Sequence, residues 1–326
     1  MVVSSKTKEL EMNKGKVMIL GSNGHLGHAA MLAFRDAGWA VTGLGRSNRK
    51  PVPGTAFVAG NADDVAVVRA AIADADVVVY ALHLRYDQWG SGRAERQLQV
   101  VLDAMGASGK TLLFPGTIYN YRAGDRTIAP SLRQHGEQPR GAIRIRLENM
   151  VRAAADAGRI QAIVLRAGDF FGPGNRGEWF ESAMLMQANK GRLLHLGDLK
   201  LRHSWAYLPD LGRAFVILAE RRGALAPFES YHFAGHWVSH GQMMTAIQNA
   251  MPEKLAIHPL PWWMLRAAGL INPVMRDIYR MRYLWLNEME LVDPRLDTLL
   301  GERFTTPFEE AVAATVDELR GAKKAA

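Results

Sequence analysis

The sequence of 326 residues contains no cysteine. This excludes disulfide bonds, thiolate nucleophiles and thiolate metal sites, and it suits a reducing compartment such as the cytoplasm. No apolar run approaches the roughly 20 residues that a membrane-spanning helix needs, and residues 1–14 lack the apolar core of a secretion signal. We expect residues 1–14 to form a disordered tail, and the protein to be cytoplasmic with no membrane span.

Basic residues outnumber acidic ones, which gives a formal net charge of +8. The arginines are scattered along the chain, and no basic block is interleaved with aromatic residues, so the pattern argues against a nucleic-acid partner. We expect part of the charge to serve anionic cofactor phosphates. The histidines fit no compact ligand spacing, and no metal site is expected.

The clearest motif is KVMILGSNGHLG at residues 16–27. Its short apolar run has the length of a buried parallel strand, and a stretch at helical period follows the glycines. Gly21 suits a tight turn, Gly24 a close approach of the backbone to a pyrophosphate, and Gly27 close packing of the helix on the sheet. Phosphates bind well to the free N–H groups of a helix N-terminus. The motif therefore predicts a dinucleotide site whose loop residues are Gly21, Asn23, Gly24, His25, Leu26 and Gly27.

The second predicted strand, residues 39–47, ends where a dinucleotide-binding protein contacts the adenosine ribose. A site for NAD needs Asp or Glu at this position to accept a hydrogen bond from the 2′-hydroxyl. This chain instead has Arg46, with Arg49 and Lys50 close behind. Because a guanidinium suits a 2′-phosphate, the sequence favours NADP over NAD as the cofactor.

Further strands are predicted at 55–60, 75–82 and 110–116, with a polar helix at 92–107 between the last two. Asn61 either contacts the adenine or caps the next helix, and capping is the expected role of Asp63. Alternation of strands and helices with short connections predicts a doubly wound parallel α/β sheet.

These motifs resemble the short-chain dehydrogenase/reductase superfamily, in particular its extended, epimerase/dehydratase-like branch. GSNGHLG resembles the Gly-x-x-Gly-x-x-Gly loop of that branch, GNADD its adenine-contact turn, and FPGTIYN the end of its fifth strand. VLRAGDFFGPG (164–174) resembles the sixth-strand motif, and HSWAYLPDLGRAFVILAE (203–220) resembles the strand and helix after the substrate loop. The resemblance covers Lys16 to about Leu319.

The resemblance implies a Rossmann domain formed by residues 15–174 and 203–235, with a smaller substrate-binding lobe from 175–202 and 236–326. It also implies cofactor contacts beyond the glycine loop, at the strand ends and on the helix after the fifth strand. The residues concerned are Arg46, Asn61, Ala62, Ala81, Leu82, His83, Arg144, Ala167 and Gly168.

Active members of this branch use a Tyr and a Lys one helical turn apart, the Lys stabilising the tyrosinate. Glu148 resembles the family's helix glutamate. Counting back from it, the lysine position falls on Arg144 and the tyrosine position on Arg140. An arginine keeps the charge and can hold the nicotinamide ribose, but it cannot transfer a proton. The chain therefore resembles the atypical members, whose active-site set is incomplete.

Three groups are candidates to replace the missing phenol. Thr117 is the only hydroxyl near the end of the fifth strand before Tyr119. Tyr119 and Tyr121 are phenols over the expected nicotinamide position, and each is either a proton donor or a packing residue. His83, after the fourth strand, is either a proton donor or part of ordinary loop hydrogen bonding. We predict Thr117, Tyr119, Tyr121 and Arg144 as the catalytic set.

Other residues are candidate contacts for a small-molecule substrate. Asp169 either holds a substrate hydroxyl, caps a turn or pairs with Arg166, and Phe170 is equally typical of a core. The predicted substrate contacts are Tyr86, Arg140, Asp169, Phe170, Arg202 and Trp263.

The segment 258–291 is rich in Trp and Met at helical spacing. It is typical of core packing, of a lid or subunit interface, or of attachment to a membrane surface, where its acidic residues count against the last. The helices predicted at 92–107 and 141–158 are those through which family members pair, so a homodimer is also expected.

The leading hypothesis is an NADP-dependent oxidoreductase that transfers a hydride between the nicotinamide and a carbonyl or alcohol, without the usual Tyr–Lys relay. One alternative is an NADP-binding redox sensor without turnover. Another is a nucleotide-sugar epimerase or dehydratase, which would need the missing relay.

Overall fold

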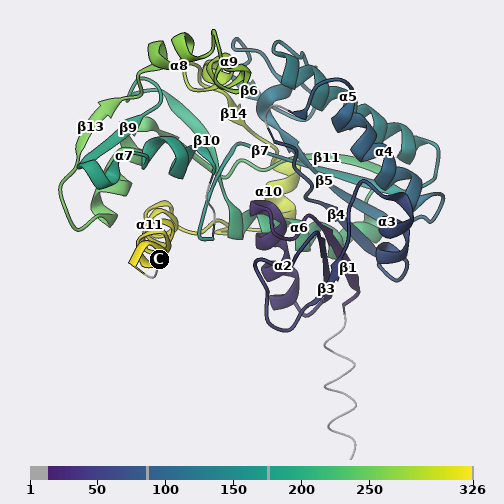
Figure 1. The fold of residues 1–326 in the computed structure, drawn as a ribbon. Coiled ribbons are helices and arrows are strands. Elements are labelled where there is room, and N and C mark those ends of the chain that lie inside the picture. The colour runs from purple at the N-terminus through teal and green to yellow at the C-terminus, as the bar shows by residue number, and fades with distance from the viewer. Residues whose placement is uncertain (1–13, 86–87, 175–176, 325–326) are drawn as a thin grey trace, which may run out of the picture.

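A computed structural model describes residues 14–85, 88–174 and 177–324 (Figure 1). The strands are β1 (Lys16–Leu20), β2 (Ala40–Gly45), β3 (Ala56–Ala59), β4 (Val77–Tyr80), β5 (Thr111–Thr117), β6 (Thr127–Ile128), β7 (Gln161–Ala167), β8 (Asp169–Phe171), β9 (Arg192–His195), β10 (Arg202–Tyr207), β11 (Phe228–His232), β12 (His236–Ser239), β13 (Ala256–Pro259) and β14 (Glu290–Leu291). The helices are α2 (His25–Asp36), α3 (Val65–Ile72), α4 (Arg93–Met105), α5 (Pro139–Asp156), α6 (Leu208–Arg221), α7 (His240–Ala250), α8 (Trp262–Ala268), α9 (Pro273–Arg280), α10 (Pro294–Leu300) and α11 (Phe308–Lys324). Short helical turns are η2 (Ile118–Asn120), η3 (Phe180–Met184), η4 (Ala188–Lys190), η5 (Arg222–Ala224) and η6 (Met281–Leu284).

Seven parallel strands form the main sheet, in the order β11-β7-β5-β4-β1-β2-β3. The strand order reverses between β1 and β4, since the chain runs outward from β1 to β2 and β3 and then returns to β4 on the other side. In open α/β sheets ligands bind at the carboxyl ends of the strands at such a point. The topology thus predicts a ligand site at the residues that follow β1 and β4.

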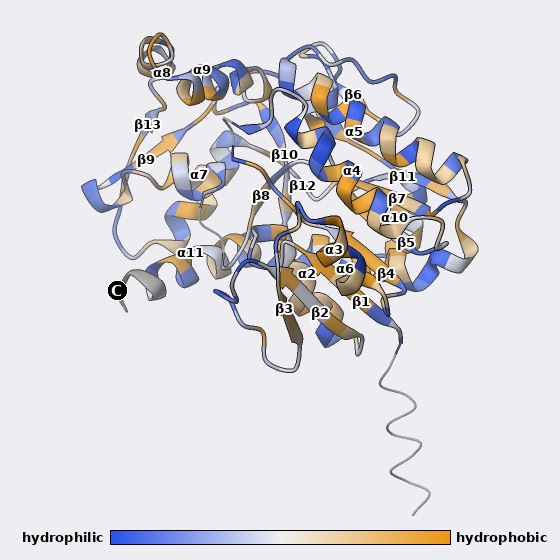
Figure 2. Cartoon of the chain, turned by 45° about the vertical axis from the view of Figure 1, so that its right-hand side comes forward, coloured by the Kyte–Doolittle hydropathy of each residue, from blue (hydrophilic) through white to orange (hydrophobic). Residues whose placement is uncertain are grey.

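Side chains of the sheet alternate between two hydrophobic cores because successive residues of a strand point to opposite faces. From β1, Val17 and Ile19 lie in the core under α2 and α6, whereas Met18 and Leu20 lie in the core under α3, α4 and α5. The strands are predominantly hydrophobic in Figure 2. The doubly wound α/β sheet predicted from the sequence is confirmed.

A third core holds the second lobe together. It combines η3, α7, α11 and the small sheets with Ile118, Tyr121 and Ile128 from the connection between β5 and α5. Within residues 203–235, β11 joins the main sheet, whereas β10 lies in a separate sheet between β8 and β12. Near the carboxyl end, α10 leaves the lobe and packs its Leu296 into the core with α2 and α6.

Most predicted elements appear within a few residues of their expected bounds, with one local correction. The helix cap at α3 is Asp64, whose carboxylate accepts hydrogen bonds from the N–H groups of Ala66 and Val67. Asp63, expected as the cap, instead accepts from the Gln97 amide at 3.2 Å. The capping prediction for Asp63 was wrong by one residue because either aspartate matches the pattern. Among the described residues, no helix is long and apolar enough to cross a membrane.

Candidate cofactor and catalytic site

The glycine loop after β1 is packed too tightly for other residues. Gly21 has φ +88°, and a Cβ there would lie 2.5 Å from the carbonyl oxygen of Ala81. A Cβ on Gly27 would lie 2.2 Å from the carbonyl oxygen of Gly21. The N-cap of α2 is Gly24, which offers no side-chain hydrogen bond, so the first N–H groups of the helix have no acceptor within the helix. This arrangement fits a diphosphate.

Asn23 connects the glycine loop to the segment after β2. Its amide N–H donates to the carbonyl of Ser47 at 2.6 Å, and its amide oxygen accepts from the N–H groups of Arg49 and Lys50 at 2.9 and 3.2 Å. Arg46 lies at the start of this segment. Its side chain is exposed and makes no hydrogen bond or ion pair within the described ranges, so its guanidinium is available to an anion.

A carboxylate from the second lobe lies beside the same helix terminus. His25, the first residue of α2, pairs through Nδ1 with Glu178. Glu181 lies near Glu178. Its pKa is raised to about 7, mainly by burial and less strongly by the negative charge of Glu178. Sequence reasoning missed both glutamates, because His25 and Glu178 are 153 residues apart and nothing near either residue signals the pairing.

Three charged side chains lie on the buried face of α5, at intervals of four residues. Arg140, Arg144 and Glu148 are each 5–6% exposed. Arg144 donates to the carbonyl of Pro115 at the end of β5. Both guanidinium groups lie near the Trp89 ring, at 5.6 Å for Arg140 and 5.9 Å for Arg144. Trp89 was not singled out from the sequence.

The turn after β5 carries the hydroxyls of the predicted catalytic set. Thr117 and Tyr119 are half-buried, whereas Tyr121 is 0% exposed and belongs to the core of the second lobe. Gly141 lets α5 approach this turn, since a Cβ there would lie 2.1 Å from the Tyr119 carbonyl oxygen. Burial lowers the pKa of Arg144, and the charges of Glu148, Tyr80 and Tyr119 oppose that effect. Arg144 lies three residues after Gly141, on the same side of α5 as this contact.

A buried ion pair between Arg166 and Glu148 holds the turn after β5 in place. Arg166 of β7 donates to Glu148 at 2.6 Å and to the carbonyl of Thr117. Glu148 also accepts from the side-chain amides of Asn120 and Gln134, at 2.9 and 2.8 Å. Burial is the largest single influence and would raise the pKa of Glu148, but Arg166, with help from Arg144 and the Gln134 amide, holds the pKa below its ordinary value.

Asp169 pairs with His203 rather than with Arg166. Its carboxylate lies 2.8 Å from His203 Nε2, and both residues are buried. The other ring nitrogen lies 3.2 Å from the Leu284 carbonyl oxygen, and the imidazole stacks on Trp285 at 4.0 Å. An oxygen atom therefore faces each ring nitrogen of His203. Of the alternatives for Asp169, pairing occurs, with a different partner.

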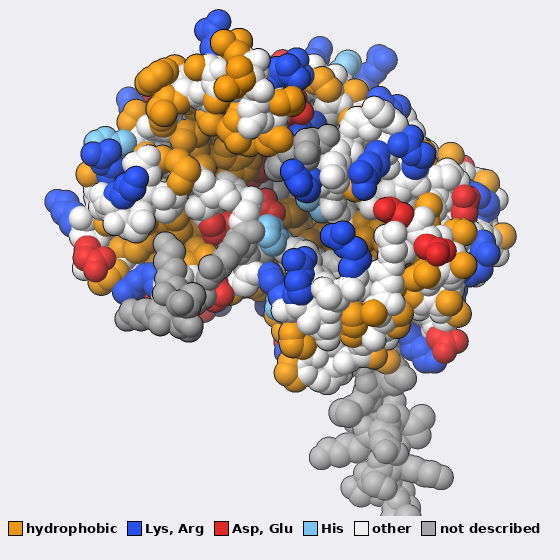
Figure 3. Space-filling view, in the orientation of Figure 1, with side chains coloured by type: hydrophobic (Ala, Val, Ile, Leu, Met, Phe, Trp, Pro, Cys, Tyr) orange, Lys and Arg blue, Asp and Glu red, His pale blue; other side chains and the backbone are white. Residues whose placement is uncertain are grey.

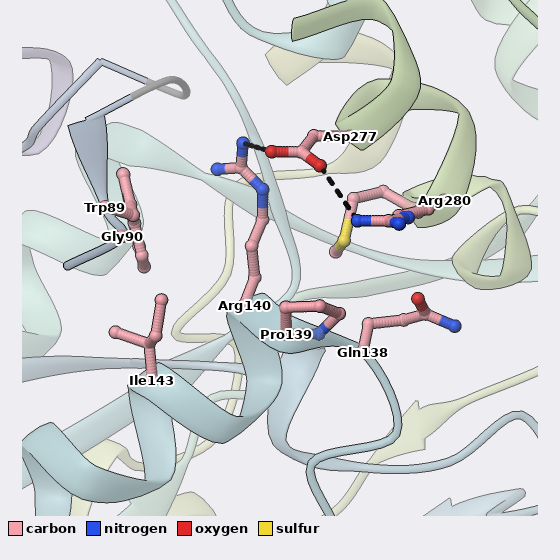
Figure 4. A pocket seen from close by; sticks show the side chains of 9 residues that line it. Trp89, Gly90, Gln138, Pro139, Arg140, Ile143, Asp277 and Arg280 are labelled. Carbon is pink, nitrogen blue, oxygen red and sulfur yellow. Dashed lines mark hydrogen bonds and ion pairs between the residues drawn. The ribbon is translucent and has the colours of Figure 1, made fainter. Parts of the chain in front are cut away.

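A cavity of about 220 Å³ lies beside the amino end of α5 (Figure 4). Arg140 points across it toward Asp277 of α9, at 3.4 Å, and Asp277 also pairs with Arg280 at 3.4 Å. Trp89 and Ile143 form the opposite wall. The cavity thus combines an aromatic wall with two guanidinium groups that share one carboxylate.

The other predicted site residues are distributed around this centre. Ala81 and Leu82 follow β4 beside Gly21, and His83 packs edge-on against Trp89 at 5.7 Å. Ala167 is buried at the end of β7, and a Cβ on Gly168 would lie 2.0 Å from the Ser204 carbonyl oxygen. In the adenine-contact turn, Asn61 accepts from the N–H of Asp63 at 3.2 Å, and Ala62 packs on the adjacent core.

Three predicted substrate contacts lie away from the cavity wall. Phe170 packs against the core under α2 and α6. Arg202 is exposed, and its backbone N–H donates to Glu288 at 3.2 Å. Trp263 is 72% exposed on α8. Tyr86 lies outside the described residues.

Comparisons with known proteins cover most of the chain. The sequence model of the NAD dependent epimerase/dehydratase family matches residues 17–233. No curated protein matches the sequence. The enzyme WbmH of Bordetella bronchiseptica, solved with NAD⁺, is 20% identical with a TM-score of 0.71, covering 94% of this chain and 99% of that one.

Two solved epimerases are similar to a comparable degree. A UDP-glucuronic acid 4-epimerase from Bacillus cereus, in complex with UDP-glucuronic acid and NAD, is 15% identical with a TM-score of 0.75. A UDP-glucose 4-epimerase from Thermus thermophilus, in complex with NAD, is 16% identical with a TM-score of 0.71. Each comparison covers 94% of this chain and 99% of the other. At these identities the likeness establishes the fold.

Proposed function

Because the chain belongs to the NAD-dependent epimerase/dehydratase family, we propose that it is an NADP-dependent oxidoreductase of that type. It would transfer a hydride between the nicotinamide and a carbonyl or alcohol carbon of a small-molecule substrate. The observation that carries the proposal is the position of Tyr119, half-buried in the turn after β5, against which α5 packs at Gly141 and whose preceding strand Arg144 bonds at Pro115. The residues that the family reserves for its Tyr–Lys pair correspond here to Arg140 and Arg144.

The residues of the glycine loop support a dinucleotide. The backbone of Gly21, Gly24 and Gly27 would hold the diphosphate against the N-terminus of α2, where the helix dipole favours negative charge. Arg46 would bind the 2′-phosphate through its exposed guanidinium, on a segment that Asn23 fixes by hydrogen bonds. The nicotinamide supplies or accepts the hydride.

The chain itself would supply the proton. A carbonyl carbon that gains a hydride leaves an oxygen that needs a proton, and the Tyr119 hydroxyl would donate it while Thr117 hydrogen-bonds the same oxygen. Arg144 would stabilise the resulting phenolate by its charge, without donating a proton itself. Tyr121 lies fully in the core, so the proposal assigns the proton to Tyr119.

Cofactor titrations test the binding half of the proposal. The unmodified protein should bind NADPH more tightly than NADH, followed by nicotinamide fluorescence. Arg46→Ala should weaken NADPH by roughly 10- to 100-fold, as expected for a charged hydrogen bond, and leave NADH nearly unchanged. Arg221→Ala, an exposed arginine on α6, is the control. Equal weakening of both coenzymes would refute the 2′-phosphate assignment, and failure of both to bind would refute the function.

Substrate screening tests the catalytic half. NADPH oxidation is followed across a panel of aldehydes, ketones and quinones, first with the unmodified protein. Tyr119→Phe should then lower turnover by about 10² or more, since general acids contribute that much, while NADPH affinity stays constant. Tyr121→Phe removes a hydroxyl from the core and should leave turnover within a few-fold. Equal turnover in both variants would overturn the assignment of Tyr119.

Two other functions are separated by the same assays. Arg140 and Arg144 are both buried and bonded to protein groups, which favours a protein that binds the cofactor without turnover. Tight NADPH binding with no oxidation by any carbonyl compound would support that redox sensor. The UDP-sugar epimerases of similar fold favour a nucleotide-sugar substrate, and conversion of UDP-glucose or UDP-glucuronic acid would replace the oxidoreductase proposal.

A further inference from the structure

A helical hairpin formed by residues 262–280 presents hydrophobic side chains to solvent. It consists of α8 and α9 and lies at the upper edge of the molecule in Figure 1. Leu270 and Ile271, in the connection between the helices, are 85% and 90% exposed, and Trp263 and Met264 on α8 are 72% and 52% exposed. Figure 3 shows hydrophobic side chains gathered over this part of the surface. No other described stretch exposes large hydrophobic residues to this extent.

The base of the hairpin is firmly attached, so the exposure belongs to a defined structure. The indole N–H of Trp262 donates to the Leu196 carbonyl at 2.7 Å, and its ring packs near Trp179 at 6.0 Å. At the turn, Gly269 allows close contact of the helices, because a Cβ there would lie 2.9 Å from the Cα of Arg276. The side-chain oxygen of Asn272 caps α9 by accepting hydrogen bonds from the backbone N–H groups of two residues in its first turn. None of these contacts uses the four exposed side chains.

Each helix of the hairpin carries an exposed arginine, whereas the neighbouring acidic residues pair with other arginines. Arg266 and Arg276 are exposed and form no ion pair or hydrogen bond through their side chains within the described part of the chain. Asp277, the only acidic residue of segment 262–280, points toward Arg140 and also pairs with Arg280 (Figure 4). Glu288 lies beyond the hairpin, with Arg126 at 3.5 Å. The acids therefore do not neutralise the arginines of the tip.

We propose that the α8–α9 hairpin docks the protein on an anionic lipid surface. Trp263, Leu270 and Ile271 would enter the interface between head groups and acyl chains, and Arg266 and Arg276 would contact the anionic head groups. Charge complementarity selects this occupant. A second copy of the chain docked through the same hairpin would add further positive charge beside Arg266 and Arg276. An anionic bilayer would instead present negative charge to both arginines. The inference does not depend on the reaction that the protein catalyses.

Flotation of the full chain with lipid vesicles tests the proposal. We expect the protein to float with vesicles of phosphatidylcholine and phosphatidylglycerol at low salt and to remain unbound with phosphatidylcholine alone. Arg266→Ala with Arg276→Ala should lower the partition coefficient by roughly thirtyfold, from the usual contribution of two interfacial basic residues. Arg192→Ala with Lys254→Ala removes two exposed charges outside the hairpin and should have little effect.

Substitution of the tip separates hydrophobic insertion from charge alone. Leu270→Glu with Ile271→Glu should abolish flotation with anionic vesicles, whereas Met186→Glu, at another exposed hydrophobic position, should not. Both proteins should keep the circular dichroism spectrum and thermal midpoint of the unmodified chain. Flotation unchanged by the tip substitutions would overturn the proposal. So would light scattering that shows a dimer, without lipid, that the same substitutions convert to a monomer, since the tip would then be an interface between two copies.

Discussion

Arg166→Met tests the buried ion pair on which the candidate catalytic turn depends. The guanidinium is 0% exposed and bonds Glu148 at 2.6 Å, the carbonyl of Thr117, and His232 Nε2 at 3.1 Å. Methionine approximates the length of the aliphatic stem and removes every donor. The Glu148 carboxylate then keeps only the amides of Asn120 and Gln134, and it remains buried without an opposite charge at hydrogen-bond distance.

Loss of one partner from a buried ion pair costs about 3–5 kcal/mol. This is a large part of the roughly 5–15 kcal/mol by which domains are stable. Replacing both partners, as Arg166→Met with Glu148→Gln, leaves no buried charge in the pair. The double variant should therefore recover at least about 1 kcal/mol of what the single variant loses.

The cost should depend on pH in a defined direction. The pKa of Glu148 in the folded protein is below its ordinary value of 4.5, because Arg166, Arg144 and the Gln134 amide together outweigh the opposing effect of burial. A lowered pKa stabilises the folded state fully above 4.5, and the contribution is lost as the pH falls toward the folded pKa. Without Arg166, burial is opposed only by Arg144 and the Gln134 amide, so that pKa rises. The gap in free energy of unfolding between the unmodified protein and Arg166→Met should thus be widest near neutral pH and narrow as the pH falls toward and below about 4.5.

Guanidinium chloride denaturation of the four proteins of this cycle, near neutral pH and at acidic pH, provides the measurement. The free energies of unfolding give the coupling between the two residues directly. Additive effects of Arg166→Met and Glu148→Gln would refute the argument, as would a gap that widens in acid. Either result would show that Arg166 acts through its packing on Tyr121, whose ring lies 5.2 Å away, rather than through its charge.

Three further predictions concern the cofactor site and its rim. Gly27→Ala places a Cβ 2.2 Å from the Gly21 carbonyl oxygen, so we expect it to abolish coenzyme binding in fluorescence titrations; Gly223→Ala, with open space around it, should not. Asn23→Ala removes three hydrogen bonds of net worth about 0.5–1.5 kcal/mol each, so it should lower the thermal midpoint measurably and weaken NADPH by at least about tenfold; unchanged affinity would contradict the bracing role of Asn23. Glu181→Gln should raise the free energy of unfolding by about 1–3 kcal/mol near pH 8 and leave it unchanged below about pH 4. The reason is that the pKa of about 7 in the folded protein penalises the charged carboxylate. An equal effect at the two pH values would show that ionisation of Glu181 is not responsible.

The fold could be predicted because its signals are local. The apolar run of β1 and the glycines after it specify strand, turn and helix within a dozen residues, and the alternation of β and α segments then restricts the topology. Helix α5 was equally accessible, since its buried face repeats every four residues. Even the error at Asp63 amounts to one position, because adjacent aspartates satisfy the same cap pattern.

The partners of the site residues could not be predicted, because they come from distant segments. His25 is paired with Glu178, Asp169 with His203, and Arg140 with Asp277. The two members of each pair are at least 34 residues apart, and no periodicity in the sequence encodes such a contact. For segment 258–291 the sequence left core packing, a lid or subunit interface, and a membrane surface as alternatives. Trp and Met at helical spacing occur both in a core and on a surface, so the pattern does not distinguish them.

The third core has a further consequence for how the chain behaves as a whole. Ile118, Tyr121 and Ile128 reach the second lobe from the connection between β5 and α5, while Leu296 of the carboxyl-terminal region packs against the helices beside β1. The chain thus passes back and forth between the main-sheet domain and the second lobe. A single cleavage of the backbone therefore cannot separate either part with all of its core residues. Thermal melting should be one cooperative event, and a fragment ending after β11 should aggregate rather than fold.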